Sequence, residues 1–172
     1  GIQLKNGRLI VTVWLSEGTG RNAHKPSVNA TIYSDDHGRT WKPGEIVIPN
    51  TPEWISASEA VAVELADGRV MFNSRSESGP NRRLVAYSKD GATGWTKPVF
   101  HDQLVEPICL ASMIRLSAGP GRNRLLFANP NNLTRADGKE EPGSSRDRKN
   151  LSVRLSYDEG QTWPVSKALE PG

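Results

Sequence analysis

A short segment with fixed offsets occurs three times in the chain, and this repeat restricts the fold more than any other feature. The copies cover residues 34–41, 88–95 and 156–163. Each begins with Ser, carries Asp two positions later and ends with Trp seven positions after the Ser. The first and third copies also share Gly and Thr, whereas the glycines of the middle copy are displaced. Three matching copies in one chain predict an internally repeated architecture.

The residue types in this segment suit a tight turn that supplies its own hydrogen bonds. Glycine adopts positive φ at low cost, and an aspartate side chain can accept hydrogen bonds from nearby backbone amides. The tryptophan that closes each turn is expected to bury its ring between layers. We therefore interpret the three segments, called Asp-boxes below, as folding elements whose carboxylates serve their own turns.

Runs typical of β-strands precede each Asp-box and lie between the boxes. Two hairpin signals, Asn6-Gly7 and Asp67-Gly68, introduce such runs. The predicted strands cover residues 9–15, 30–33, 59–65, 70–74, 84–87, 111–116, 125–128 and 151–155. Helical periodicity is not convincing anywhere. We predict an all-β fold of repeated antiparallel sheets, which stack radially as the blades of a β-propeller.

Charge, cysteine content and hydropathy exclude several classes of protein. The chain has 22 Lys and Arg against 19 Asp and Glu, interspersed, and this excess is too small for a nucleic-acid-binding surface. Cys109 is the one cysteine, so an internal disulfide and a cysteine-based metal cluster are excluded. No residue spacing favours a metal site, and we expect no cofactor and no obligate protein partner. We expect neither a membrane span nor, after Gly1, a signal peptide in this stretch.

Strand direction predicts which end of each sheet carries function. In the middle unit the chain runs out along one strand, turns at Asp67-Gly68 and returns along the next, so Glu59 and Arg75 lie at the end opposite the Asp-box. A hairpin with so short a loop places Glu59 opposite Arg75 or its neighbour, with a register uncertain by one residue. An acid and a guanidinium are therefore expected to meet at the mouth of one hairpin.

The same alternation of strand direction applies to the other two units. The loop 130–149, which contains Arg146 and Arg148, lies at the end away from the third Asp-box, and the loop 17–28 of the first unit joins it there. Binding and catalytic residues are often found on loops that a rigid scaffold positions. We therefore expect a site at this end of the sheets.

The chain resembles the exo-α-sialidase (neuraminidase) family, most closely its bacterial and lysosomal-type members. The resemblance rests on the Asp-boxes together with SEAVAVEL at 58–65, NSRS at 73–76, NP at 129–130 and RKNLSVRLSYDEG at 148–160. It covers essentially the whole chain in order. It implies a six-bladed β-propeller of which about three blades are present, with residues 1–172 as an interior segment of a single domain.

Members of this family are retaining glycosidases that release terminal sialic acid from glycoconjugates. The resemblance implies three arginines that bind the substrate carboxylate, a nucleophilic Tyr polarised by a Glu, and an Asp as acid/base. Glu59 matches the glutamate, and Arg75 and Arg148 match the second and third arginines. Arginine suits this task because its planar fork binds a carboxylate through two parallel hydrogen bonds. Sialylated glycans are the implied partners, and the family suggests a secreted, periplasmic or lysosomal location.

Other residues are weaker candidates. The candidate pocket-lining residues are Trp54, Asn73, Asn129 and His24. Arg146 is close enough in sequence to be mistaken for Arg148, whereas Arg154 lies in mid-strand and is expected to be structural. His37, Asp35 and Asp36 lie in an Asp-box at the wrong end, and Asp36 is expected to serve its own turn.

The resemblance also implies parts that this chain lacks. The first arginine and the acid/base Asp are expected before residue 1, and the nucleophilic Tyr after residue 172. Tyr33, Tyr87 and Tyr157 adjoin or lie within Asp-boxes and are poor substitutes. The chain alone is therefore expected to be inactive. Two alternatives stay open, a propeller that binds an acidic sugar without cleaving it and a structural interaction propeller.

Overall fold

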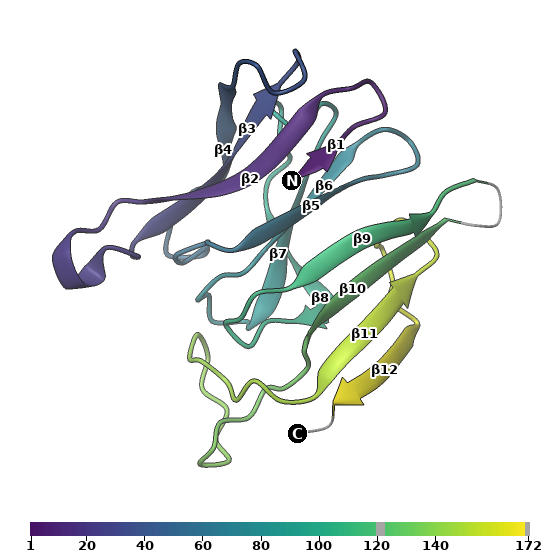
Figure 1. Ribbon diagram of the computed structural model, residues 1–172. Helices are drawn as coiled ribbons and strands as arrows, with labels where there is room; N and C mark the ends of the chain where they lie inside the picture. Colours follow the sequence, from purple (N-terminus) through teal and green to yellow (C-terminus); the bar gives the residue numbers. More distant parts are fainter. Residues whose placement is uncertain (120–122, 171–172) are drawn as a thin grey trace.

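The computed structural model describes residues 1–119 and 123–170, which form three four-stranded antiparallel sheets arranged as consecutive blades (Figure 1). The first sheet contains β1 (Ile2–Gln3), β2 (Leu9–Ser16), β3 (Ser27–Ser34) and β4 (Lys42–Ile48). The second contains β5 (Ala60–Glu64), β6 (Val70–Ser74), β7 (Arg82–Ser88) and β8 (Val99–Val105). The third contains β9 (Ser112–Ser117), β10 (Arg124–Pro130), β11 (Leu151–Ser156) and β12 (Val165–Glu170).

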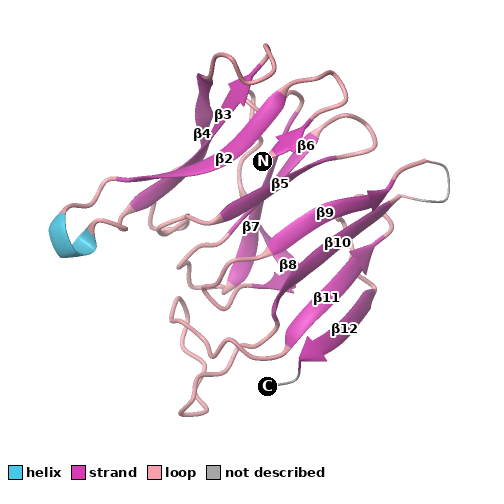
Figure 2. Ribbon diagram, in the orientation of Figure 1, coloured by secondary structure: helices cyan, strands magenta, loops and turns pink. Residues whose placement is uncertain are grey.

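Strands and loops account for almost all of the described chain (Figure 2). One short 3-10 turn, η1 (Gly20–Asn22), lies in the loop between β2 and β3. Within residues 1–119 and 123–170 there is no α-helix. In the same part of the chain, no helix has the length and apolar character needed to cross a membrane. The all-β, propeller-type fold expected from the repeat is confirmed.

The sequence pattern found eight strands and missed four. All eight predicted runs are strands, with ends that differ by a few residues. The missed strands are β1, which has two residues, and β4, β8 and β12, which follow the Asp-boxes. These three are the outer strands of their sheets. Every side chain of β12 is exposed, and β4 contains Pro43 and Gly44, so neither shows the alternation that marks a half-buried strand.

The first Asp-box supplies its own hydrogen bonds, as predicted. The Ser34 hydroxyl donates to the Asp36 carboxylate at 2.7 Å and accepts from the Gly38 amide at 2.8 Å. The Asp36 carboxylate also accepts from the Thr40 amide at 2.9 Å and from the Thr40 hydroxyl at 2.6 Å. These bonds, led by the one from the Thr40 side chain, lower the pKa of Asp36 to about 2. The carboxylate is therefore fully used within its own turn.

The other two boxes form the same bonds. The third repeats the first with Ser156, Asp158, Gly160 and Thr162. The middle box is one residue shorter between Asp90 and Thr93, yet Asp90 still accepts from the Thr93 amide at 2.8 Å and from its hydroxyl at 3.0 Å. Burial raises the pKa of Asp90, but the hydrogen bonds to its carboxylate outweigh this and hold the pKa well below its usual range. The displaced glycines therefore shorten the turn without altering its bonding.

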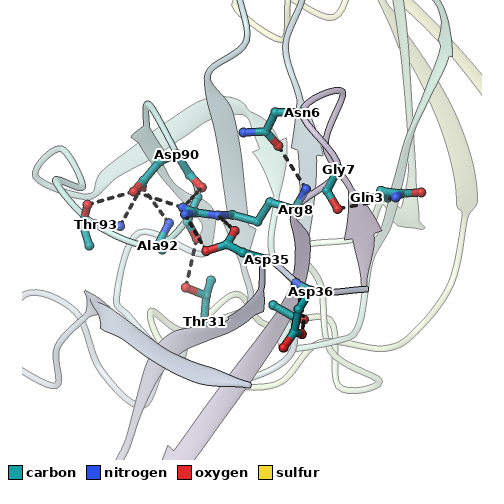
Figure 3. A network of polar contacts seen from close by, with 12 residues as sticks. Gln3, Asn6, Gly7, Arg8, Thr31, Asp35, Asp36, Asp90, Ala92 and Thr93 are labelled. Carbon is teal, nitrogen blue, oxygen red and sulfur yellow. Dashed lines mark hydrogen bonds and ion pairs between the residues drawn. The ribbon is translucent and has the colours of Figure 1, made fainter. Parts of the chain in front are cut away.

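The second and third Asp-boxes each pack against the blade that precedes them in the chain. A Cβ at Gly91 would lie 2.0 Å from Cδ1 of Ile10 in β2, and a Cβ at Gly160 would lie 3.0 Å from the sulfur of Met71 in β6. A side chain at either position would therefore have to displace its neighbour, and the positive φ of both residues also favours glycine. Arg8 strengthens the first contact, since its guanidinium lies between Asp35 at 2.7 Å and Asp90 at 3.2 Å (Figure 3).

The three box tryptophans differ in burial, which corrects one prediction. Trp163 is 5% exposed and packs on Phe127, and Trp95 lies edge-on to Phe72 at 5.6 Å between ring centroids. Trp41 is 43% exposed, so its ring is not buried between layers. The reason is its position. Trp95 and Trp163 pack toward the preceding blade, and in this chain no blade precedes the one that contains Trp41.

Candidate functional site

The loops at the end away from the Asp-boxes enclose a cavity. Its volume is about 410 Å³. The lining side chains come from strand ends and loops of all three blades and are Trp14, His24, Lys25, Ser27, Ser56, Ser58, Glu59, Arg75, Glu77 and Ser145. A pocket of this size is in the range that binds small molecules. Of the sequence candidates, Glu59, Arg75 and His24 line it.

Glu59 and Arg75 form an ion pair on the cavity wall. The register of β5 and β6 pairs Ala60 with Ser74, which places Glu59 directly opposite Arg75 one step beyond the ladder. The Arg75 amide donates to the Glu59 carbonyl at 3.0 Å, and Nη1 of Arg75 lies 2.6 Å from Oε2 of Glu59. The prediction that acid and guanidinium meet at this hairpin mouth is confirmed.

Both side chains of this pair remain accessible from the cavity. The Arg75 side chain is 20% exposed and that of Glu59 is 38% exposed. Nε of Arg75 is buried and has no hydrogen-bond partner among the described residues. The pair therefore keeps hydrogen-bonding capacity that no neighbouring group in that part of the chain uses.

The segment that carries Glu59 is fixed by side chains of the first blade. Three of these donate to its carbonyl groups, namely Ser27 to Ala57 at 2.8 Å, Asn29 to Ser58 at 2.5 Å and Thr12 to Ala60 at 2.8 Å. Ser27 and Asn29 are fully buried. Buried hydrogen bonds of this kind hold a segment in one geometry. The contact between the first two blades therefore sets the position of Glu59.

The loop between β10 and β11 closes the cavity on its third side through Ser145. Arg146 is buried within this loop, where its guanidinium donates to the carbonyls of Ser144 and Glu141 and to the side chain of Asn81. The Arg146 guanidinium is therefore engaged in hydrogen bonds within the protein. Arg148 is exposed, makes no hydrogen bond or ion pair with the described residues, and does not line the cavity. Its expected place in a carboxylate clamp with Arg75 stays a prediction.

Asn81 ties three loops of this end together. It accepts from the Gly143 amide at 2.9 Å and from Arg146 at 3.2 Å, and its amide group donates to the carbonyl of Glu106 at 3.2 Å. Its φ of +50° is tolerated better by Asn than by most side chains. This residue was not predicted from the sequence.

A buried ion pair behind the cavity was also missed. Arg83 of β7 and Glu106 are both fully buried and hydrogen-bonded to each other, and Arg83 donates further to Asn73 at 2.7 Å and to the carbonyl of Cys109 at 3.1 Å. Burial lowers the pKa of Arg83 and raises that of Glu106, while the charge of each partner opposes these shifts. A charged residue inside an apolar strand such as β7 is the signal that could have indicated this pair.

Three candidate pocket-lining residues lie elsewhere, which corrects the sequence analysis. Trp54 is 9% exposed and belongs to a core cluster with Phe72. Asn73 is buried and accepts from Arg83, and Asn129 is buried and accepts from Arg154 at 2.9 Å. Strand alternation turns Asn73 of β6 and Asn129 of β10 toward the interior, whereas Trp54 lies in the β4–β5 loop and packs its ring into the core.

The rim of the cavity on the first blade combines an aromatic pair with an ion pair. Trp14, at the end of β2, is 38% exposed, and its ring centroid lies 6.0 Å from that of His24. Nζ of Lys25 lies 2.6 Å from Oε2 of Glu77, which joins the β2–β3 loop to the second blade. The parity argument that placed His24 at this end could also have found Trp14.

The tyrosines of the described residues lie away from this cavity. The Tyr33 ring lies beneath the Arg8 guanidinium at 4.5 Å, and the Tyr87 ring beneath Arg69 at 5.4 Å. Burial raises the pKa of Tyr87. Tyr157 is exposed next to the third Asp-box. The prediction that these residues adjoin box turns is confirmed.

Comparison with known proteins agrees with this geometry. The family described as BNR repeat-like domain matches residues 1–172. A sialidase of Micromonospora viridifaciens is 38% identical over 181 residues, covering 100% of this chain and 24% of the relative. A sialidase of Bacteroides fragilis is 29% identical over 176 residues, covering 98% of this chain and 27% of the relative.

A solved structure shows the same fold. The Hadza microbial sialidase Hz136 has a TM-score of 0.70 and 28% identity to this chain, covering 100% of it and 30% of that structure. The chain therefore spans about a quarter of the length of the curated relatives. Its three blades, its Asp-boxes and these matches show that the chain belongs to the BNR repeat-like domain family, within which its relatives are sialidases.

Proposed function

We propose that the chain supplies part of the active site of a retaining glycoside hydrolase that releases terminal sialic acid from glycoconjugates. The observation that carries the proposal is the Glu59–Arg75 ion pair on the wall of a cavity built from three blades. The sialidase relatives support the substrate class. Sialylated glycans are then the partners of this cavity.

Each site residue has a distinct task in this proposal. Arg75 binds the carboxylate of the acidic sugar, and Arg148 joins it from the β10–β11 loop. Glu59 accepts the proton of a nucleophilic hydroxyl group. A neutral nucleophile suits this substrate because the anomeric carbon bears a carboxylate, which would repel an approaching anionic side chain. The Arg148 side chain has no partner among the described residues, so it can bind an anion without first breaking an ion pair.

We further propose that residues 1–172 form three consecutive blades of one larger propeller. The short coverage of the relatives and the exposed ring of Trp41 support this. In the described part of the chain no tyrosine lines the cavity. We therefore expect the 172-residue chain alone to bind sialic acid without hydrolysing a fluorogenic sialoside. Release of the fluorophore by the purified chain would refute that expectation.

Calorimetric titration with the methyl α-glycoside of sialic acid tests the binding role. Arg75→Ala and Arg148→Ala should each weaken binding at least about tenfold, because a hydrogen bond to a charged group contributes roughly 1.5–3 kcal/mol. Arg69→Ala is the matched control, since Arg69 lies in the β5–β6 turn at the opposite end and pairs with Asp67. Absence of binding to the unaltered chain, or equal binding by Arg75→Ala, would contradict the proposal.

A further inference from the structure

The wall of the cavity on the first blade differs chemically from the wall that holds Glu59 and Arg75. It contains Trp14, a large apolar residue that remains 38% exposed. Trp14 lies within strand β2 and is paired with Asn29 of β3, so its backbone is rigid. The ring of His24 lies beside it at 6.0 Å between centroids. This wall is a fixed aromatic platform on an open cavity.

The charged groups near this platform are neutralised. Lys25 and Glu77 lie on the rim and pair with each other at 2.6 Å. The part of the cavity next to Trp14 therefore offers no uncompensated charge to an anion, and an uncharged group suits it better.

Free hydroxyl groups surround the same space. Ser56, Ser58 and Ser145 line the cavity, and their side chains make no hydrogen bond with any described residue. A hydroxyl group both donates and accepts, which matches the hydroxyl groups of a sugar. An aromatic side chain offers a flat apolar face to the C–H side of a pyranose ring. The two features together fit a neutral sugar.

From this arrangement we infer a second subsite in which Trp14, flanked by His24, stacks on the uncharged pyranose ring that is linked to the acidic sugar. The inference rests on the proposed function, because the acidic sugar bound at Arg75 brings its neighbour to the platform. Trp14 thereby distinguishes an acidic sugar carried on a glycan from the same sugar on a small leaving group. The nearby serine hydroxyls bind the ring substituents.

The test compares two ligands that share the same anomer of sialic acid. The purified chain is titrated with methyl α-sialoside and with α-linked sialyl-lactose, and both dissociation constants are measured. We expect sialyl-lactose to bind about two- to tenfold more tightly, the range of an aromatic stacking contact. Trp14→Ala and Trp14→Leu should both abolish this difference and leave the Kd of the methyl sialoside unchanged.

Trp41→Ala is the matched control, because Trp41 is 43% exposed but lies at the Asp-box end. It should change neither Kd, and thermal unfolding checks that each variant is folded. Equal affinity for the two ligands, an unaltered difference in the Trp14 variants, or an equal loss for both ligands would overturn the inference alone. Failure of the unaltered chain to bind either ligand would overturn the proposed function as well.

Discussion

The two ends of the same three sheets are organised in different ways. At the Asp-box end, all three blades have equivalent Ser, Asp and Thr bonds with the carboxylate fully used, although the middle turn is one residue shorter. At the loop end, each blade differs in loop length and contact. There the ion pair of Glu59 and Arg75 faces a cavity, and the hydroxyl groups of Ser56, Ser58 and Ser145 on its lining make no bond to described residues.

This difference distinguishes residues that stabilise every blade from residues that we assign to the proposed function. A feature that recurs in every blade meets a need that every blade has, namely closing a turn and packing on a neighbour. A feature that occurs in one blade only, such as the Glu59–Arg75 pair, does not meet a need that all blades share. The Asp-box carboxylates look like hydrolytic acids in the sequence, but their hydrogen bonds leave them no capacity for a substrate. The comparison leads to predictions about both ends.

The largest effect is expected where a charge is buried behind the cavity. Glu106→Ala leaves the fully buried guanidinium of Arg83 without its carboxylate. Breaking a buried ion pair in this way costs about 3–5 kcal/mol of unfolding free energy. Urea denaturation measures the cost. A cost of this size would show that the loop end depends on one buried ion pair for its stability. The turns at the Asp-box end, in contrast, supply their own hydrogen bonds.

A double variant is the control for this prediction. Arg83→Met combined with Glu106→Leu removes both charges and should recover most of the lost stability, because an apolar pair of similar volume avoids the desolvation cost. A cost below about 1 kcal/mol for Glu106→Ala would contradict the assignment.

The second effect concerns the contact between an Asp-box and the preceding blade. Gly91 and Gly68 both have positive φ, at +72° and +88°. A Cβ at Gly91 would lie 2.0 Å from Ile10, whereas at Gly68 it would meet nothing within 4 Å. We expect Gly91→Ala to destabilise the fold by about 1–3 kcal/mol more than Gly68→Ala. Equal thermal unfolding midpoints of the two variants would show that the blades do not pack here.

The third effect is the acid sensitivity of the Asp-box end. Hydrogen bonds from Thr40 lower the pKa of Asp36 from 3.8 to about 2. The unfolded chain therefore binds a proton at higher pH than the folded chain. The stabilisation is complete above pH 3.8 and is lost as the pH falls toward 2. Urea midpoints between pH 2 and 7 should decline in this window.

Thr40→Val sharpens this third prediction. It removes the hydroxyl that contributes most to the low pKa of Asp36 while the amide bond to the carboxylate remains. The variant should lose less stability between pH 3.8 and 2 than the unaltered chain. An identical decline would show that Asp36 does not cause it.

The Asp-box end was predicted well because the residues that bond to one another there are close together in the sequence. Ser34, Asp36 and Thr40 lie within one turn, so their spacing already implies their bonds. Strand direction and the short turn at Asp67-Gly68 were enough to predict that Glu59 lies opposite Arg75. The Arg83–Glu106 pair and the Asn81 contacts join residues that are far apart in the sequence, so local spacing does not show which residues are partners. Trp54, Asn73 and Asn129 were wrongly predicted to line the pocket, because a position near a loop does not show whether its side chain points into the core.

The smallest effect on stability is expected at the site itself, and it distinguishes the two ion pairs of the second blade. Arg75 and Glu59 are 20% and 38% exposed, whereas Arg83 and Glu106 are fully buried. An accessible pair contributes about 0–1 kcal/mol. Arg75→Ala and Glu59→Gln should therefore lower the unfolding free energy by no more than about 1 kcal/mol. The same Arg75→Ala chain should lose its affinity for methyl α-sialoside. A cost comparable to that of Glu106→Ala would mean that Glu59 and Arg75 hold the hairpin together, and the loop end would then resemble the Asp-box end in using its charges for folding.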